Sequence, residues 1–203
     1  MTELALRGYA VLQANSRGGG LAGYGSAYSL PVVRVRDHSY PDVMRGVDRM
    51  IALGVADSAR IGITGLSHGG LAVAWAIGQT RRFKAAIVNA GSYDQLSAAI
   101  MNPSAVADFG TEPREDLRPF IAHSPMTYLK HVVTPTLILH GELDPLSSVS
   151  QGHNLHIALQ RMGVPTEMVV YPGEGHPVLA PKHLVDIGKR HVMWMDRYLR
   201  DQR

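Results

Sequence analysis

The sequence contains no cysteine, which excludes disulfide bridges, thiolate metal sites and a cysteine nucleophile. It also lacks an apolar run long enough to span a bilayer, and no basic segment followed by an apolar one opens the chain. Neither sign of charge is in large excess, because the net charge is only +3 and acidic residues are spread throughout. These absences argue against nucleic acid or a membrane as a partner, and they predict a cytoplasmic protein.

The composition is that of a folded domain, because 45% of the 203 residues are hydrophobic and 18% are charged. We expect one domain over residues 1–203, in which short apolar runs alternate with stretches of helical periodicity. This alternation predicts an α/β fold with a mostly parallel sheet covered by helices on both faces. The strands are expected at residues 9–13, 60–64, 83–89, 136–140 and 167–171, and the helices at 2–7, 37–53, 71–77, 149–162 and 184–199.

The stretch from Gly91 to Pro125 has mixed polarity, four prolines and no clear period. Long irregular segments of this kind often cover a functional site. We therefore expect residues 91–125 to form a cap-like excursion over the active face.

Gly18, Gly20 and Gly23 give a literal G-x-G-x-x-G after an expected strand, which raises the question of dinucleotide binding. That interpretation requires a helix beginning inside the motif, and the following Tyr24-Gly25-Ser26 and Pro31 do not favour one. The sequence also has no H-E-x-x-H or P-loop pattern. We expect no cofactor and no metal.

Ser67 lies in Gly65-Leu66-Ser67-His68-Gly69, a G-x-S-x-G motif between an expected strand and an expected helix. This is the pattern of a nucleophile elbow, in which a Cβ at Gly65 or Gly69 would crowd the turn. The backbone N–H of His68 would then face a developing oxyanion at the helix N-terminus. A serine N-cap in a glycine-rich connection is the alternative interpretation.

Asp144 and His176 follow two later strands, so the order is Ser67, Asp144, His176, as in α/β-hydrolases. The carboxyl ends of parallel strands meet at one edge of a sheet. A serine hydroxyl becomes a good nucleophile when imidazole accepts its proton, and a carboxylate orients the imidazole and stabilises its cation. These three residues are therefore a candidate catalytic triad.

Other residues compete for two of these roles. Glu142 and Asp94 are alternative acids, and Asp94 follows an earlier strand. Four more histidines come after Asp144, but they lie on or beside expected helices: His153, His156, His183 and His191. His153 and His156 have helical spacing, yet a metal site would need a third ligand nearby.

The chain resembles the catalytic domain of the prolyl oligopeptidase family of serine peptidases, nearest its acylaminoacyl-peptidase and dipeptidyl-peptidase branches. The resemblance runs nearly from end to end and implies an α/β-hydrolase fold with Ser67, Asp144 and His176 as nucleophile, acid and base. Two departures are His68, where these peptidases often have tyrosine, and the Gly-Gly-Gly after Arg17. The motifs that carry the resemblance are Arg7-Gly8-Tyr9-Ala10-Val11, Asn15-x-Arg17-Gly18, Asp57-x-x-Arg60-Ile61-Gly62-Ile63-Thr64-Gly65-x-Ser67-x-Gly69-Gly70, Ser124-Pro125, Thr134-Pro135-Thr136-Leu137-Ile138-Leu139-His140-Gly141-Glu142-x-Asp144, Val149-Ser150-Gln151 and Tyr171-Pro172-Gly173-Glu174-Gly175-His176.

The resemblance also implies an N-terminally shortened hydrolase sheet. Relative to the family, the strand between the one matching Tyr9–Gln13 and the one before Ser67 would be missing, together with the loop that supplies a second oxyanion donor. Loss of one such donor typically costs about 10²–10³ in rate. The unpaired edge that a missing strand leaves favours self-association into a homo-oligomer.

Three functions are consistent with these features. The first is a serine hydrolase that cleaves peptide or acyl-amino bonds of short peptides. The second is a carboxylesterase that acts on small acyl esters, since a triad does not distinguish an amide from an ester. The third is a non-catalytic remnant on the hydrolase scaffold, because fold does not guarantee function.

Overall fold

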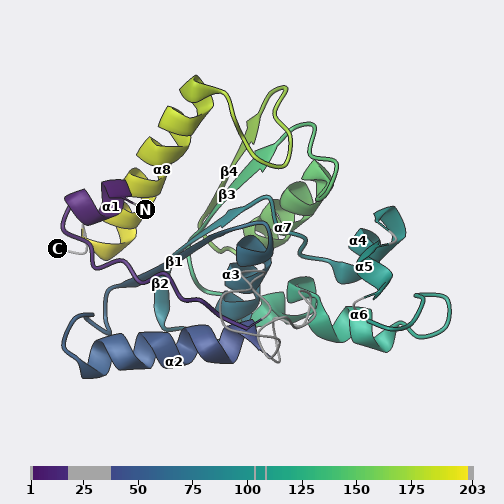
Figure 1. Ribbon diagram of the computed structural model, residues 1–203, viewed down its shortest axis with the longest axis horizontal. Helices are drawn as coiled ribbons and strands as arrows, with labels where there is room; N and C mark the ends of the chain where they lie inside the picture. Colours follow the sequence, from purple (N-terminus) through teal and green to yellow (C-terminus); the bar gives the residue numbers. More distant parts are fainter. Residues whose placement is uncertain (1, 18–37, 103, 108, 201–203) are drawn as a thin grey trace.

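The computed structural model describes residues 2–17, 38–102, 104–107 and 109–200 (Figure 1). Within this part of the chain, four parallel strands form one sheet in the order β1-β2-β3-β4. The strands are β1 (Ile61–Leu66), β2 (Phe83–Asn89), β3 (Thr136–Gly141) and β4 (Thr166–Tyr171). Four of the five predicted strands are therefore confirmed, and their carboxyl ends share one edge of the sheet.

Helices cover both faces of the sheet, as predicted. Their bounds are α1 (Thr2–Leu6), α2 (Ser39–Ala52), α3 (His68–Gln79), α7 (Val149–Arg161) and α8 (Pro181–Leu199). Figure 1 shows α1 and α8 together on one side of the strands and α2 and α3 on the other. The helix predicted from Leu184 begins three residues earlier, because Pro181 is well suited to the first turn of a helix.

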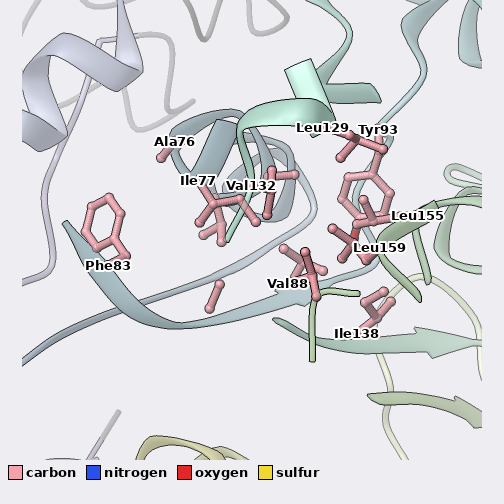
Figure 2. Close-up of a cluster of buried hydrophobic side chains, with 14 of the residues drawn as sticks. Ala76, Ile77, Phe83, Val88, Tyr93, Leu129, Val132, Ile138, Leu155 and Leu159 are labelled. Atoms are coloured by element: carbon pink, nitrogen blue, oxygen red, sulfur yellow. The ribbon is translucent and has the colours of Figure 1, made fainter. Parts of the chain in front are cut away.

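From Ala85 to Val88, the buried side chains of β2 alternate between two hydrophobic clusters, since successive residues of a strand point to opposite faces. Ala86 and Val88 belong to the cluster under α2, α3 and α7. In Figure 2, Val88 and Ile138 lie beneath side chains that include Ile77 and Leu155. Ala85 and Ile87 belong to the opposite cluster, which contains Trp194 and Met195 of α8. The sheet is thus buried on both faces, as its apolar strands require.

The strand predicted at Tyr9–Gln13 is wrong. These residues have no regular secondary structure, and side chains at the C-terminal end of α8 and just after it hold Tyr9 in place. The Tyr9 hydroxyl donates to Asp196 Oδ1 at 2.6 Å, and the Arg200 guanidinium lies 4.5 Å from the centre of the Tyr9 ring. A strand needs a neighbour for its backbone hydrogen bonds, and among the described residues no strand lies beside β1 opposite β2.

Residues 91–125 contain short helices that the sequence pattern did not reveal, α4 (Gln95–Met101), α5 (Ser104–Ala107) and α6 (Arg118–His123), before the 3₁₀ helix η3 (Pro125–His131). They have a small hydrophobic cluster of their own around Phe109 and Phe120. The side chain of Gln151 on α7 ties the start of this segment to the main domain, because its Oε1 accepts from the N–H groups of Tyr93 and Asp94 at 2.8 and 2.9 Å. The glycine motif at residues 18–23 lies outside the described residues.

None of the helices in the described ranges is both long and apolar enough to cross a membrane.

Candidate active site

Ser67 occupies the tight connection between β1 and α3, with φ 58° and ψ −118°. A positive φ is rare for a residue with a Cβ and marks backbone strain, which often occurs at functional sites. The Ser67 N–H donates to the carbonyl oxygen of Asn89 on β2 at 2.8 Å, which fixes the strained turn. The Ser67 side chain makes no N-cap hydrogen bond to α3. The interpretation as a simple helix cap is therefore wrong.

Two glycines make this turn possible, but they are not the pair predicted. A Cβ at Gly65 would lie 2.3 Å from backbone atoms of Gly69, so this prediction is confirmed. A Cβ at Gly69 itself would meet nothing within 4 Å, apart from its neighbours and its own helix backbone, so the predicted crowding there is wrong. The second position that excludes a side chain is Gly70, where a Cβ would lie 2.8 Å from the Asn89 carbonyl oxygen. This contact lets α3 pack directly on β2.

The structure brings together the three side chains of the candidate triad. The Ser67 Oγ lies 2.7 Å from His176 Nε2, and His176 Nδ1 lies 2.8 Å from Asp144 Oδ2. Because a carboxylate only accepts hydrogen bonds, Nδ1 carries the proton toward Asp144. Nε2 is then unprotonated in the neutral ring and accepts from the Ser67 hydroxyl. This is the tautomer that general-base catalysis by His176 requires.

Backbone donors hold the Asp144 carboxylate in place. The N–H groups of Leu146 and Ser147 both donate to its Oδ1 at 2.9 Å, which leaves Oδ2 for His176. The two competing acids have other partners. Asp94 caps α4 by accepting from the Leu96 N–H at 3.1 Å, and Glu142 accepts from the Gly173 N–H at 2.9 Å.

His68 is the first residue of α3, where a helix leaves N–H groups without intrahelical partners. Its backbone N–H is therefore suited to bind an oxyanion next to Ser67. Its side chain lies elsewhere, with Nε2 3.2 Å from the Ser39 hydroxyl. Burial lowers the pKa of the His68 imidazole, so this ring is neutral at physiological pH.

A cavity of about 170 Å³ opens beside Ser67 and His176. Its wall includes residues of α4, so the segment at 91–125 lies next to the candidate triad. Apolar and polar side chains both line it, among them Leu71, Ala90, Ala98, Leu146, Ser92 and Gln95.

Three of the other histidines after Asp144 have local partners: His156, His183 and His191. His156 Nδ1 lies 3.2 Å from the Thr166 hydroxyl, and no group of three or more possible metal ligands occurs in the described ranges. His183 Nδ1 lies 2.5 Å from Glu174 Oε1. His191 Nε2 lies 3.2 Å from the Thr64 hydroxyl.

Two polar residues near the triad had no assigned role in the sequence interpretation. Glu174, in the loop that carries His176, accepts from the N–H groups of Leu179 and Ala180 at 2.9 and 3.1 Å, and it thereby closes that loop. His140, on β3, is fully buried and lies below Asp144. For His140, the one sequence signal of a special role was a histidine at the end of an apolar strand. For Glu174, the only signal was its place in the motif that ends at His176.

A parallel sheet with a strained serine after one strand, and an aspartate and a histidine after two later ones, is the arrangement of an α/β-hydrolase. Comparison with protein families gives the narrower assignment. The chain belongs to the prolyl oligopeptidase family, whose model matches residues 1–202.

Relatives agree with this assignment. The uncharacterized peptidase YuxL of Bacillus subtilis is 36% identical, over 97% of this chain and 31% of its own length. Dipeptidyl-peptidase 5 of Porphyromonas gingivalis is 31% identical, over 97% of this chain and 30% of its own length. The solved structure of the acylaminoacyl peptidase of Pyrococcus horikoshii has a TM-score of 0.83 and 27% identity, and the match covers 93% of this chain and 32% of that one. The chain thus spans about a third of the length of these relatives.

Proposed function

We propose that this chain carries the catalytic centre of a serine peptidase that cleaves peptide or acyl-amino bonds of short peptides through an acyl-enzyme. The observation that carries the proposal is the continuous hydrogen-bonded path from Ser67 Oγ through His176 to Asp144, with links of 2.7 and 2.8 Å. The names of the relatives, dipeptidyl-peptidase and acylaminoacyl peptidase, support the substrate class.

The first half of the reaction follows from this geometry. Ser67 Oγ attacks the substrate carbonyl carbon while its proton moves to His176 Nε2. The resulting imidazolium is stabilised by Asp144, and the oxyanion faces the His68 N–H. The C–N bond then breaks, the leaving amine takes the proton from Nε2, and the acyl group stays on Ser67.

The second half restores the enzyme. His176 accepts a proton from a water molecule, which attacks the acyl carbon. The C–O bond to Ser67 breaks, and Oγ recovers its proton from Nε2. The product carboxylic acid leaves, and all three side chains return to their initial protonation states.

Labelling with a fluorophosphonate tests the nucleophile, since such probes phosphonylate an activated serine. We expect one labelled residue, Ser67, and no labelling of S67A. Turnover by S67A should fall roughly 10⁶-fold in kcat. Absence of labelling in folded wild-type protein would leave only the non-catalytic interpretation.

The substrate class needs a second comparison. An acyl-alanine anilide and p-nitrophenyl acetate present an amide and an ester to the same centre. We expect hydrolysis of the anilide by the wild-type chain and none by S67A. Turnover of the ester alone would instead assign a carboxylesterase.

A further inference from the structure

His140 is a second imidazole at the candidate triad, on the side of Asp144 away from solvent. It ends the apolar part of β3, and its side chain is fully buried. Its Nε2 lies 2.7 Å from the Ser147 carbonyl oxygen and 3.3 Å from Asp144 Oδ2. Asp144 Oδ2 is also the oxygen that accepts from His176.

The contacts determine the tautomer of His140. A carbonyl oxygen only accepts, so Nε2 carries a proton and donates it to Ser147, while Asp144 Oδ2 lies 3.3 Å from the same nitrogen. Nδ1 is then unprotonated, and it is buried without a hydrogen-bond partner. It lies against α7 at Gly152, where a Cβ would be only 3.1 Å away.

The ring is neutral. Burial lowers the pKa of His140, and the other titratable groups that act on it are Asp144 and His176. An unpaired Nδ1 in a buried site destabilises the fold, and an aliphatic side chain of similar size would avoid that cost. Filling of the core therefore does not explain an imidazole at this position, whereas the hydrogen bond of its N–H to Ser147 and the approach of the same group to Asp144 do.

We propose that His140 is a positioning residue for Asp144, an inference that rests on the proposed function. Its Nε2 lies 3.3 Å from Oδ2 while backbone N–H groups bind Oδ1, so a donor group faces each oxygen of the carboxylate. The same N–H anchors the Ser147 carbonyl and thereby the turn from Asp144 to Ser147. The free lone pair of Oδ2 is then held toward the Nδ1–H of His176.

Two amide variants separate this role from a structural one. In H140Q the side-chain nitrogen falls near the place of Nε2 and can still donate to Asp144, whereas in H140N it falls near the place of Nδ1 and cannot reach. Both bury one amide, so a purely structural role predicts similar losses. We expect kcat/KM on the anilide to fall about 10–10²-fold in H140N and to stay within about fivefold of wild type in H140Q. H191N is the matched control, because His191 contacts Thr64 rather than Asp144, and we expect near wild-type turnover.

A spectroscopic readout makes the test independent of turnover. The proton between His176 and Asp144 should give a strongly downfield ¹H NMR resonance, which H140N should weaken or shift and H140Q should preserve. Equal behaviour of H140N and H140Q in both measurements, or a loss in H191N as large as in H140N, would overturn the proposal. If H140N does not fold, H140M replaces it with the same expected result. If wild-type protein neither labels nor turns over, the proposed function fails, and the resonance alone still decides the role of His140.

Discussion

Replacement of Gly141 by alanine should uncouple the candidate base from the nucleophile. Gly141 is the last residue of β3, and the loop that carries His176 crosses directly over it. An added Cβ would lie 2.1 Å from the carbonyl oxygen of Gly175 and 2.7 Å from that of Glu174. Both obstacles are backbone atoms, so no side-chain rotation relieves the overlap.

The size of the effect follows from these distances. Real Cβ atoms essentially never approach other atoms within 3.0 Å, so the loop must retreat by about 0.9 Å from the 2.1 Å contact. His176 is the residue after Gly175 and moves with it. A misplacement of about 1 Å in a catalytic group costs about 10²-fold in rate, equivalent to about 2.7 kcal/mol in the activation free energy. Overpacking should also lower the free energy of unfolding by about 1–3 kcal/mol, or roughly 3–10 °C in Tm.

Gly175→Ala is the matched control, because it adds the same methyl group to the same loop. A Cβ there would meet nothing within 4 Å, and the backbone of Gly175 is not in the left-handed region. The second-order rate of fluorophosphonate labelling at Ser67, together with kcat/KM and Tm, should fall in G141A and stay near wild type in G175A. Labelling of G141A within threefold of wild type would refute the argument from the backbone contact, as would an equal loss in G175A.

Three further predictions concern other contacts. G65A should unfold at a lower temperature and react slowly with the fluorophosphonate, because its Cβ overlaps the backbone of Gly69. G69A should melt at or above the wild-type temperature, since its Cβ meets nothing and alanine favours a helix. E174Q should lower kcat/KM about tenfold with a smaller effect on KM, because the N–H groups of Leu179 and Ala180 lose their hydrogen bonds to a charged carboxylate. An unchanged kcat would contradict this prediction. The hydrogen bonds from Arg17 hold the pKa of Asp42 below its usual value, so their stabilisation is complete above the unfolded-state pKa and disappears as the pH falls through the folded-state pKa. D42N should therefore be less stable than wild type in urea at neutral pH, and the difference should shrink as the pH falls below about 4, the usual pKa range of an aspartate.

Local patterns in the sequence were enough to predict most of the fold. The β2 strand at Phe83–Asn89 has the predicted bounds, because its apolar run is bounded by a charged turn and by Gly91. The α7 helix ends where Gly163 adopts a φ of +72°, as its position after an amphipathic run predicts. Features of this kind depend on neighbours along the chain.

The errors concern features that depend on neighbours in space. Tyr9–Gln13 has the composition of a strand, but a strand forms only beside another strand. Among the described residues, no strand lies between this segment and β1 to bond the backbone of both. Gly69 and Gly70 are adjacent in the sequence, and only the packing of α3 on Asn89 shows which of them excludes a side chain. The spacing of the motif predicts the turn, but the position of β2 determines which of the two glycines has no room for a side chain.

The candidate triad could be predicted from local sequence patterns, because Ser67, Asp144 and His176 each follow an expected strand within a recognisable motif. The residues that position these three side chains could not be predicted in this way. The sequence did not indicate a role for His140, since its contact with Asp144 depends on how the turn after β3 folds back over the strand.

Strand β2 lies between the strands that precede Ser67 and Asp144, and it therefore sets the distance between these two residues. Ser67 follows β1 and Asp144 follows β3, so β2 separates the nucleophile from the acid. At the end of β2, the Asn89 carbonyl accepts from the Ser67 N–H at 2.8 Å, and the N–H of Ala90 donates to Leu139 on β3 at 3.0 Å. Ala90 also has a positive φ of 49°, so two adjacent segments each hold a strained residue with a Cβ. Because a single peptide unit links the elbow to β3, a change of conformation at residues 89 and 90 alters the gap between Ser67 and Asp144 that His176 has to bridge.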